Sequence, residues 1–331
     1  VWPLGQEAAF AASLAERYHT VAGVLHAIRE SVSTHVQSAQ ELRPLDEGSP
    51  LARSHSTTYP IVQGPMARVS DRAQFALHVA EGGALPFLAL AQLRAPEIES
   101  LLDETRRLLD GRPWGVGILG FVPTDLRQEQ VGVIRRYRPP FALIAGGRPD
   151  QARALQEEGI ATYLHVPSPG LLRLFLQDGA RRFVFEGREA GGHIGPRSSF
   201  ILWDSMIDVL AEHLPASEAA DCHVLFAGGI HDALSASMVA TAAAPLAKLG
   251  VRVGLLLGTS YVFTQEALAT GAILPGFQKE ALRCQRTVIL ESAPGHAIRC
   301  ARTPYADLFQ QEKERQVQEG KPPDEIRQML D

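Results

Sequence analysis

Eight short apolar runs recur along the chain about every 25 residues, and stretches with helical periodicity follow them. The hydrophobicity within each run is continuous rather than alternating, which is typical of parallel strands buried on both faces. Eight strand–helix units within about 200 residues predict an α/β fold, the (β/α)8 TIM barrel. The runs lie at residues 59–67, 84–90, 114–120, 141–147, 161–167, 181–187, 223–229 and 251–258.

A doubly wound open sheet is the alternative arrangement of the same elements. It is disfavoured because no GxGxxG sequence follows the first run. Residues 59–275 form the predicted barrel, and residues 1–58 precede it as an N-terminal extension of two helical stretches and a polar linker. Residues 276–331 form a C-terminal helical cap or linker, in which "RTVIL" is a short strand candidate. Because the chain begins with Val1 rather than Met, we expect it to be a piece of a longer protein.

Composition narrows the classes of partner and the compartment. A net charge of -5 gives no electrostatic reason to expect nucleic acid or an anionic membrane as a partner. The three cysteines are widely spaced and form no CxxC pair, which is typical of reduced thiols and predicts a cytoplasmic location. The chain has neither an apolar run of membrane-spanning length nor an N-terminal signal peptide.

Glycines gather where most of the runs end, which in this fold is the end that carries the active site. Glycine lets backbone N–H groups approach a ligand closely. In "AGGI" (227–230) and "GTS" (258–260), backbone amides and the hydroxyls of Thr259 and Ser260 predict a phosphate site. A phosphate there, beside an open floor of glycines, suits a flat phosphorylated cofactor such as FMN.

Four motifs resemble those of the nitronate monooxygenase family, whose members are FMN-dependent (β/α)8 barrels: "QGPMARVSD", "GREAGGHIG", "AGGI" and "LGTSYVFT". The same fold includes flavin-dependent enoyl-acyl-carrier-protein reductases. The similarity covers about residues 59–275. The longer wordings "FEGREAGGHIGPRSSFILWDSMI" and "TVILESAPGHAIRC" resemble the variant embedded in polyketide and polyunsaturated fatty acid synthases.

The resemblance implies a catalytic role for His193. The residues that it implies for FMN binding are Gln63, Gly64, Pro65, Met66, Glu189, Ala190, Gly191, Gly192, Gly228, Gly229, Gly258 and Thr259. We add Gly117 and Ser260 because of their positions at the ends of the third and eighth runs.

The expected activity is that of an NAD(P)H-dependent enoyl reductase of a synthase, with an acyl carrier protein or other synthase domains as partners and a small acyl substrate. A nitronate monooxygenase that uses FMN and dioxygen is the alternative, and a degenerate structural barrel is a third interpretation. Whether the protein is a homodimer stays open.

The chain departs from the family pattern at two places. The third run often carries an Asn after "GV" in the family, near the flavin ring, whereas this chain has Gly117. The "AGGI" motif is often followed by a glycine two residues on, whereas here the sequence continues His231-Asp232-Ala233. Both changes are compatible with phosphate binding but weaken the case for monooxygenase chemistry.

Four other histidines need an interpretation. His165 ends the fifth run and is predicted to point toward the mouth, whereas His223 begins the seventh run and is predicted to be structural. His231 and His296 follow glycines in predicted loops, where a structural role is favoured. No HxxxH, HExxH or Cys/His cluster occurs, so no metal site is predicted. The sequence also contains neither a GxSxG nucleophile elbow nor a Walker loop.

Overall fold

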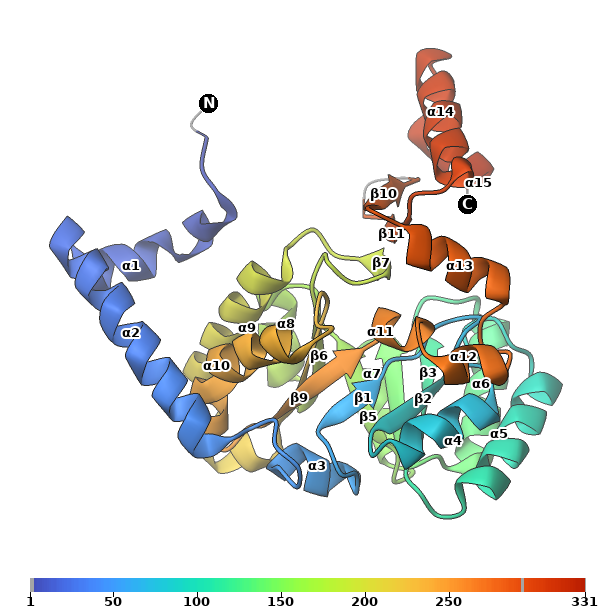
Figure 1. Cartoon of the computed structure of the whole chain (residues 1–331), viewed down its shortest axis with the longest axis horizontal. Helices are drawn as coiled ribbons and strands as arrows, with labels where there is room; N and C mark the ends of the chain where they lie inside the picture. The colour runs from blue at the N-terminus through green and yellow to red at the C-terminus, as the bar shows by residue number, and fades with distance from the viewer. Residues whose placement is uncertain (1–2, 293–294, 331) are drawn as a thin grey trace.

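The computed structural model of the protein describes residues 3–292 and 295–330. Eight parallel strands close into a barrel, in which β9 pairs with β1 (Figure 1). Each strand lies inside one of the eight apolar runs, so the predicted (β/α)8 barrel is confirmed. The barrel strands are β1 (Ile61–Gln63), β2 (Leu85–Ala89), β3 (Gly115–Leu119), β4 (Phe141–Ala145), β5 (Ala161–His165), β6 (Arg182–Glu186), β8 (His223–Ala227) and β9 (Arg252–Leu257).

Helices surround the barrel and connect consecutive strands. Those that cover the sheet are α4 (Ala73–Glu81), α5 (Ala95–Leu109), α6 (Thr124–Tyr137), α7 (Pro149–Gln156), α8 (Pro169–Gln177), α9 (Ser199–His213) and α10 (Ala233–Leu249). The 3-10 helix η2 (Ala216–Asp221) precedes β8. After β9 the chain forms the shorter helices α11 (Thr259–Val262), α12 (Gln265–Ala269) and α13 (Pro275–Arg283).

Alternate residues of each strand enter two separate hydrophobic cores, because successive side chains of a strand point to opposite faces. Leu143 and Val184 belong to the core inside the barrel. Their neighbours Ile144 and Phe183 belong to the core between the sheet and the helices. Both faces of the strands are therefore buried, which explains why the runs are continuously apolar.

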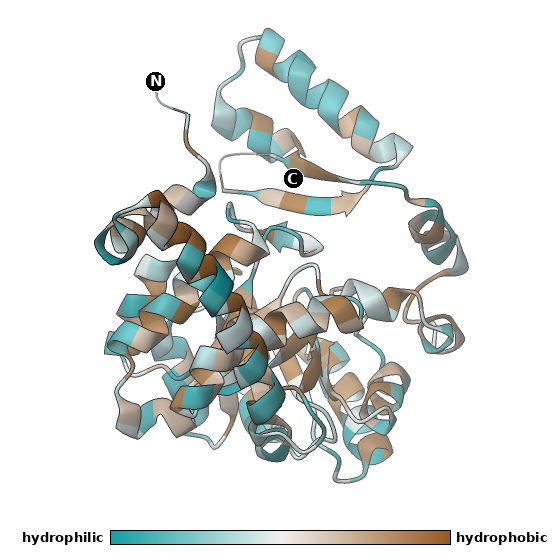
Figure 2. Ribbon diagram, turned by 60° about the vertical axis from the view of Figure 1, so that its left-hand side comes forward, coloured by the Kyte–Doolittle hydropathy of each residue, from teal (hydrophilic) through white to brown (hydrophobic). Residues whose placement is uncertain are grey.

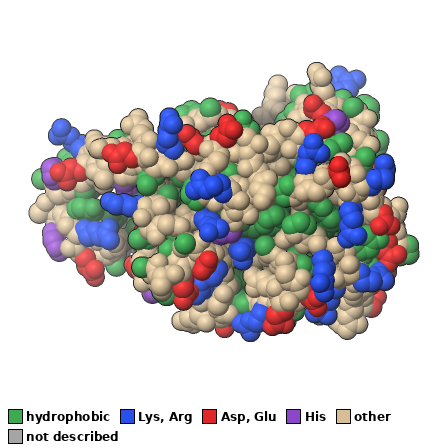
Figure 3. Space-filling view, turned by 90° about the horizontal axis from the view of Figure 1, so that it is seen from below, with side chains coloured by type: hydrophobic (Ala, Val, Ile, Leu, Met, Phe, Trp, Pro, Cys, Tyr) green, Lys and Arg blue, Asp and Glu red, His purple; other side chains and the backbone are tan. Residues whose placement is uncertain are grey.

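The end of the barrel where the strands begin is closed by α3 (Pro50–His55), which lies in the segment that reads as a polar linker. Leu51 is fully buried in the inside core. A Cβ on Gly254 would lie 2.2 Å from Leu51 Cδ2, so glycine is needed there to admit the helix. Figure 3 looks at the molecule from this side and shows Lys and Arg side chains near the middle of the face.

The N-terminal extension contains η1 (Gln6–Phe10), α1 (Ala11–Tyr18) and α2 (Val21–Leu42). Helix α2 runs along α10 on the outside of the barrel. Neither α1 nor α2 has a fully buried residue. Among the described residues, no helix combines the length and the apolar character that a membrane crossing requires.

The C-terminal segment contains a hairpin as well as helices. The strand candidate "RTVIL" is confirmed as β10 (Thr287–Glu291), and it pairs with β11 (Ala297–Ala301), which the sequence did not predict. Helices α14 (Pro304–Gln318) and α15 (Pro323–Leu330) follow. Figure 2 shows that α14 is mostly hydrophilic and that β10 is largely hydrophobic. Strand β11 was missed because its five residues include Arg299, and because one of its two partner strands comes from the distant segment β7 (Gly192–Ile194).

Candidate active site

The carboxyl ends of the eight barrel strands present small residues toward the inside of the barrel. Continuing the alternation of the inside core to the carboxyl ends of the strands gives one inward-facing residue for each, at or directly after the strand end; on β3, Leu119 faces inward one step beyond Gly117. Six of these eight positions are Gly or Ala, so the barrel mouth has little side-chain bulk at its base. We call this set the mouth layer, and it consists of Gly64, Ala89, Gly117, Ala145, His165, Glu186, Ala227 and Gly258.

The segment after β1 crosses the inside of the mouth and touches this layer. A Cβ on Gly117 would lie 2.3 Å from Pro65 Cβ, so the proline ring fills the space that a side chain at residue 117 would need. A Cβ on Gly258 would lie 3.4 Å from Met66 Sδ. The structure thus brings four predicted site residues together across β1, β3 and β9. In this chain an Asn at residue 117, which the family often has there, would overlap Pro65 as it lies.

Gln63 faces away from the inside of the barrel. It is 1% exposed, and its side-chain amide lies 3.4 Å from the Phe87 carbonyl oxygen. Its Oε1 is buried and has no hydrogen-bond partner within the described part of the chain. Gln63 therefore lies beside the mouth rather than at its base.

The loop that carries His193 passes over the mouth. We call residues 187–198 the His193 loop. A Cβ on Gly191 would lie 3.3 Å from Thr259 Oγ1, next to β9, and a Cβ on Gly195 would lie 3.6 Å from Pro167 Cβ, next to β5. Between these points the exposed His193 ring lies 6.5 Å from the ring of Phe121, which follows β3. The single imidazole of the glycine-rich loop is thus held above the mouth.

The C-terminal hairpin fixes this loop by strand pairing. Strand β7 within the loop pairs antiparallel with β11, and His193 lies opposite Ile298. The Arg299 side chain donates from Nε to the Arg188 carbonyl oxygen at 2.9 Å, and from Nη1 to Thr287 Oγ1 at 2.7 Å. Residues beyond the barrel therefore position the loop that carries the predicted catalytic residue.

Glu189 closes the base of the His193 loop. Its Oε2 accepts hydrogen bonds from the backbone N–H of Ser199 at 2.7 Å and from Ser199 Oγ at 2.6 Å, which anchors the start of α9. A Cβ on Gly229, at φ 78°, would lie 3.2 Å from Glu189 Cβ. Two predicted site residues therefore meet here, and the Glu189 carboxylate is engaged in building the loop. Ala190 and Gly192 lie in the same loop.

The predicted phosphate site lies where β8 and β9 end. Gly228 has a φ of 104°, a conformation that glycine adopts without steric cost. Thr259 and Ser260 begin the single turn α11 after Gly258. The N-terminus of α10 is capped by Asp232, whose carboxylate accepts a hydrogen bond from the Ser235 N–H at 2.8 Å. His231 bonds through Nδ1 to the Gly229 carbonyl oxygen at 2.9 Å, so this departure from the family pattern forms a local capping structure.

His165 and Glu186 are the two polar members of the mouth layer. Their Nδ1 and Oε2 atoms lie 3.0 Å apart, and each side chain is about one-fifth exposed. Sequence reasoning placed His165 at the mouth and overlooked Glu186. The available signal was its place as the last residue before the glycine that ends the sixth run, two residues after Val184. This pair is a second titratable group at the mouth besides His193.

The remaining histidines lie elsewhere. His223 is buried at the end of the barrel that α3 closes. Its Nδ1 lies 3.2 Å from Tyr163 Oη, and its Nε2 lies 3.3 Å from a guanidinium nitrogen of Arg252. This supports its structural interpretation. His296 directly precedes β11. Among the residues that the structure describes, no three His, Cys, Asp or Glu side chains could hold a metal ion together.

Several curated proteins resemble the chain in sequence, and two of them have different activities. A (3aS,4S,5R,7aS)-5-hydroxy-7a-methyl-1-oxo-octahydro-1H-indene-4-carboxyl-CoA dehydrogenase from Rhodococcus jostii is 25% identical over 217 residues, which cover 65% of this chain and 55% of that protein. The chain thus spans little more than half the length of this relative. Nitronate monooxygenase from Pseudomonas aeruginosa is 27% identical over 284 residues, which cover 72% of this chain and 76% of that protein.

Solved structures share the fold. FabK from Thermotoga maritima superposes with a TM-score of 0.67 at 25% identity, and the match covers 81% of this chain and 79% of that chain. The enoyl reductase domain of MlnA from the macrolactin biosynthesis cluster of Bacillus amyloliquefaciens has the same fold, with a TM-score of 0.61 at 15% identity over 81% of this chain and 70% of that chain. The family model for nitronate monooxygenase matches residues 122–327, which is more than half of the sequence. The chain belongs to the nitronate monooxygenase family of oxidoreductases.

Proposed function

We propose that the chain is an FMN-dependent enoyl reductase domain that uses NAD(P)H to reduce an enoyl thioester carried by an acyl carrier protein. The observation that carries this proposal is the mouth layer of small residues with His193 held above it. FabK, an enoyl-acyl-carrier-protein reductase, resembles the chain in fold and sequence. The dehydrogenase from Rhodococcus jostii is named for a carboxyl-CoA compound, which is also a thioester.

The residues at the mouth fit FMN. Little side-chain bulk obstructs a flat ring beside Gly258. Pro65, which covers Gly117, and Met66 contribute the apolar contacts that an aromatic ring needs. Backbone amides near Gly228 and the hydroxyl of Thr259 would hold the phosphate, as glycine-rich strand ends do in this fold. Bound FMN would supply two-electron redox chemistry, in which a hydride received from NAD(P)H passes to the β-carbon of the substrate.

His193 would handle the proton of the reaction. Saturation of the carbon–carbon double bond adds a hydride to the β-carbon and a proton to the α-carbon, while negative charge develops on the thioester oxygen. An imidazole can hydrogen-bond that oxygen or deliver the proton. The His193 loop places this single imidazole over the mouth, with Phe121 as its aromatic neighbour.

A nitronate monooxygenase is the second candidate function, and the likeness to the Pseudomonas enzyme favours it. In that reaction His193 would act as a base on the carbon beside the nitro group, and dioxygen would be the oxidant. The packing of Pro65 over Gly117 counts against this function, because the position where the family often has an Asn has no room for one.

Anaerobic mixing of the FMN-loaded protein with NADPH, and separately with propane 2-nitronate, tests the proposal. We expect NADPH to bleach the flavin absorbance rapidly and the nitronate to leave it unchanged. Bleaching by the nitronate alone would favour the monooxygenase instead. If the protein bound no FMN on reconstitution, a structural barrel inside a synthase would be the remaining interpretation.

A further inference from the structure

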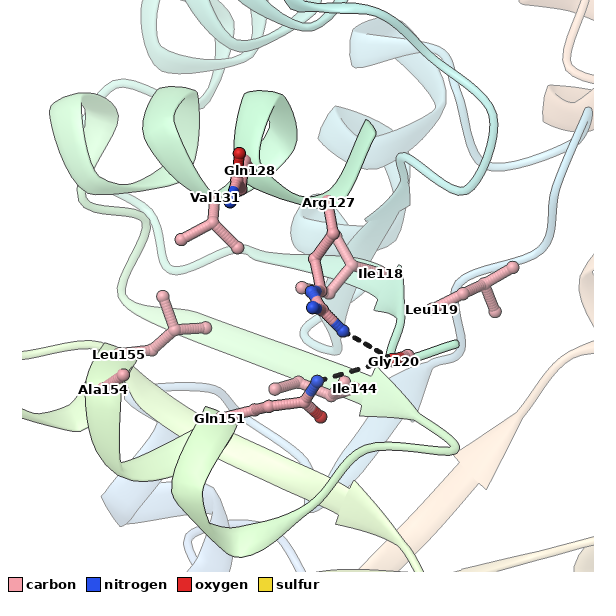
Figure 4. A pocket seen from close by; sticks show the side chains of 10 residues that line it. All are labelled: Ile118, Leu119, Gly120, Arg127, Gln128, Val131, Ile144, Gln151, Ala154 and Leu155. Carbon is pink, nitrogen blue, oxygen red and sulfur yellow. Dashed lines mark hydrogen bonds between the residues drawn. The ribbon is translucent and has the colours of Figure 1, made fainter. Parts of the chain in front are cut away.

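Two surface features lie outside the barrel mouth. One is a groove between helices α6 and α7, in which Arg127 and Gln151 donate hydrogen bonds to the Gly120 carbonyl oxygen at 3.3 Å and 3.4 Å (Figure 4). The Gly120 N–H donates to the Ala145 carbonyl oxygen at 2.8 Å, so the backbone separates this groove from the mouth. The other feature is helix α2, whose exposed side chains include a regular row of apolar residues.

Helix α2 has the residue spacing of a coiled coil. In a coiled coil, the residues that face the partner helix recur alternately four and three residues apart. On α2 this spacing holds for seven successive positions, of which six are apolar and one is a histidine. We call these positions the α2 seam, and they are Val21, Leu25, Ile28, Val32, His35, Ala39 and Leu42.

Much of the α2 seam faces solvent. Its first four residues are between 57% and 79% exposed, whereas His35 and Ala39 are half-buried. Helix α2 lies along α10 at the outer edge of the molecule, and none of its residues is fully buried by the described part of the chain (Figure 1). The contact with α10 thus leaves the seam open over residues 21–32.

The sequence of α2 gives little reason for it to be helical without a partner. Its 22 residues include six β-branched residues, three serines and one glycine, which are weaker helix formers than Ala or Leu. The Thr20 hydroxyl caps the N-terminus by accepting a hydrogen bond from the Gly23 N–H at 3.0 Å. Helices in proteins obtain most of their stability by burying an apolar face, and this face of α2 is exposed. A partner on the seam would supply that burial.

The exposed area is of the size that a dimer needs. Seven large apolar residues of α2, five in the seam and Val24 and Val36 beside it, are 40–79% exposed. They leave roughly 600 Å² of surface in water, which is the upper end of the largest apolar patch on a typical monomer. Burying it on two copies would remove about 1,200 Å², the lower end of the range for specific, stable interfaces.

The seam fits a copy of itself. In a coiled coil each seam side chain inserts between four residues of the facing helix, so two helices with the same spacing are complementary. Arg29, Glu30 and Glu41 lie outside the seam and nearly balance in charge. They therefore neither repel a second copy strongly nor select a partner of opposite charge.

We propose that α2 pairs through the α2 seam with α2 of a second copy of this chain, which makes the protein a two-fold symmetric homodimer. In such an interface both copies use the same patch. The seam lies on the side of the barrel and contains none of the mouth-layer residues, so this inference does not depend on the reaction at the mouth.

Sedimentation equilibrium of the chain between about 1 and about 100 µM tests the proposal. We expect a monomer–dimer equilibrium with a Kd on the order of 1–10 µM, because the interface is at the small end of the stable range. The melting temperature should rise with protein concentration, since only the folded chain dimerises. A chain that stays monomeric over this range would overturn the proposal.

The double variant Leu25→Glu with Ile28→Glu tests the seam itself. We expect its Kd for dimerisation to rise at least about 100-fold, because four carboxylates would have to leave water without partners. Both side chains are exposed, so the circular dichroism of the monomer should not change. Ser33→Glu is the matched control, since it adds the same charge at an exposed position of α2 outside the seam and should keep the Kd within about twofold.

If the double variant folds poorly, Ile28→Ser should still raise the Kd about tenfold by removing an apolar contact from each copy. Leu282→Glu with Leu308→Glu is a second control, because these leucines of α13 and α14 are 66% and 62% exposed and lie outside the seam. This variant should dimerise like the parent. A dimer that persists in the seam variants, or that only the α13 and α14 variant disrupts, would overturn the proposal.

Discussion

His193 is exposed, yet its position is fixed from several sides. Strand pairing with β11 sets its backbone, and the Phe121 ring lies beside its imidazole. A titratable side chain held in this way needs no rearrangement before it meets a substrate, which is how enzymes position acid–base groups.

His193→Ala should lower turnover about 10²–10⁴-fold, the usual range for positioned acid–base catalysis, while FMN binding and the melting temperature stay unchanged. His231→Ala is the matched control, since His231 is also an exposed loop histidine and bonds only to its own capping structure and the adjacent Asp232. Stopped-flow and thermal-shift measurements check both. Turnover equal to that of the parent would return His193 to a structural role.

The Pro65 ring occupies the space that a side chain at residue 117 would need. Gly117→Ala should destabilise the protein by about 1–3 kcal/mol through overpacking, and should weaken FMN binding because the loop after β1 must move. Removing the ring as well, in Gly117→Ala with Pro65→Gly, should recover part of both losses. FMN fluorescence titration and denaturant unfolding measure the effects. Equal Kd values for FMN in Gly117→Ala and the parent would show that the pair does not shape the site.

At the scale of elements, the C-terminal hairpin acts on the His193 loop from outside the barrel. Ile194, Ala297 and Leu290 are all buried, so the three-stranded sheet has a small apolar contact of its own. Arg299 adds the link to the Arg188 carbonyl that strand pairing alone does not give.

Arg299→Ala should loosen β7, which would speed amide hydrogen exchange at residues 192–194 and lower kcat about tenfold, because a small misplacement of a catalytic group is costly. Arg302→Ala is the control, since Arg302 forms only an exposed ion pair with Asp307. Arg299→Lys should retain part of the activity. If exchange at these amides did not change, the hairpin would not be holding the loop.

The elements that were predictable from the sequence differ from the missed ones in how much of their surface is buried. The eight strands were predictable because both of their faces are buried and their runs are therefore apolar throughout. Helix α3 was missed because it buries only Leu51, Ala52 and His55. The glycines of the site were predictable from the strand ends, but the contact of Pro65 with Gly117 and the pairing of Glu186 with His165 depend on barrel closure and have no local signal.

At the scale of the whole molecule, two histidines buried at the end of the barrel that α3 closes make the free energy of unfolding depend on pH. Burial, with Arg182 and Arg252 nearby, lowers the pKa of His55 to about 3. Burial, with Arg182, His55 and Arg252 nearby, lowers the pKa of His223 to about 2. Both imidazoles are thus neutral in the folded protein near neutral pH and at mildly acidic pH.

The free energy of unfolding should therefore fall as the pH drops below about 6.5, the ordinary histidine pKa, because the unfolded chain then binds protons that the folded chain cannot. Above that pH both states are neutral at these groups and the contribution is constant. His223→Asn should roughly halve the part of the slope that the two buried histidines contribute between about pH 5 and 6. Urea unfolding across this range checks the prediction, and a slope in His223→Asn equal to that of the parent would contradict it.

The second half of the reaction tests the assignment of the barrel mouth as an enoyl reductase site most directly. The FMN-loaded protein would be reduced under anaerobic conditions with one equivalent of NADPH, and then mixed with a trans-2-enoyl N-acetylcysteamine thioester while the flavin absorbance is followed. We predict that the absorbance returns, that the saturated thioester forms in equal amount, and that His193→Ala slows the return about 10²–10⁴-fold. A flavin that stays bleached with the enoyl thioester, yet recovers on admission of air, would contradict the assignment.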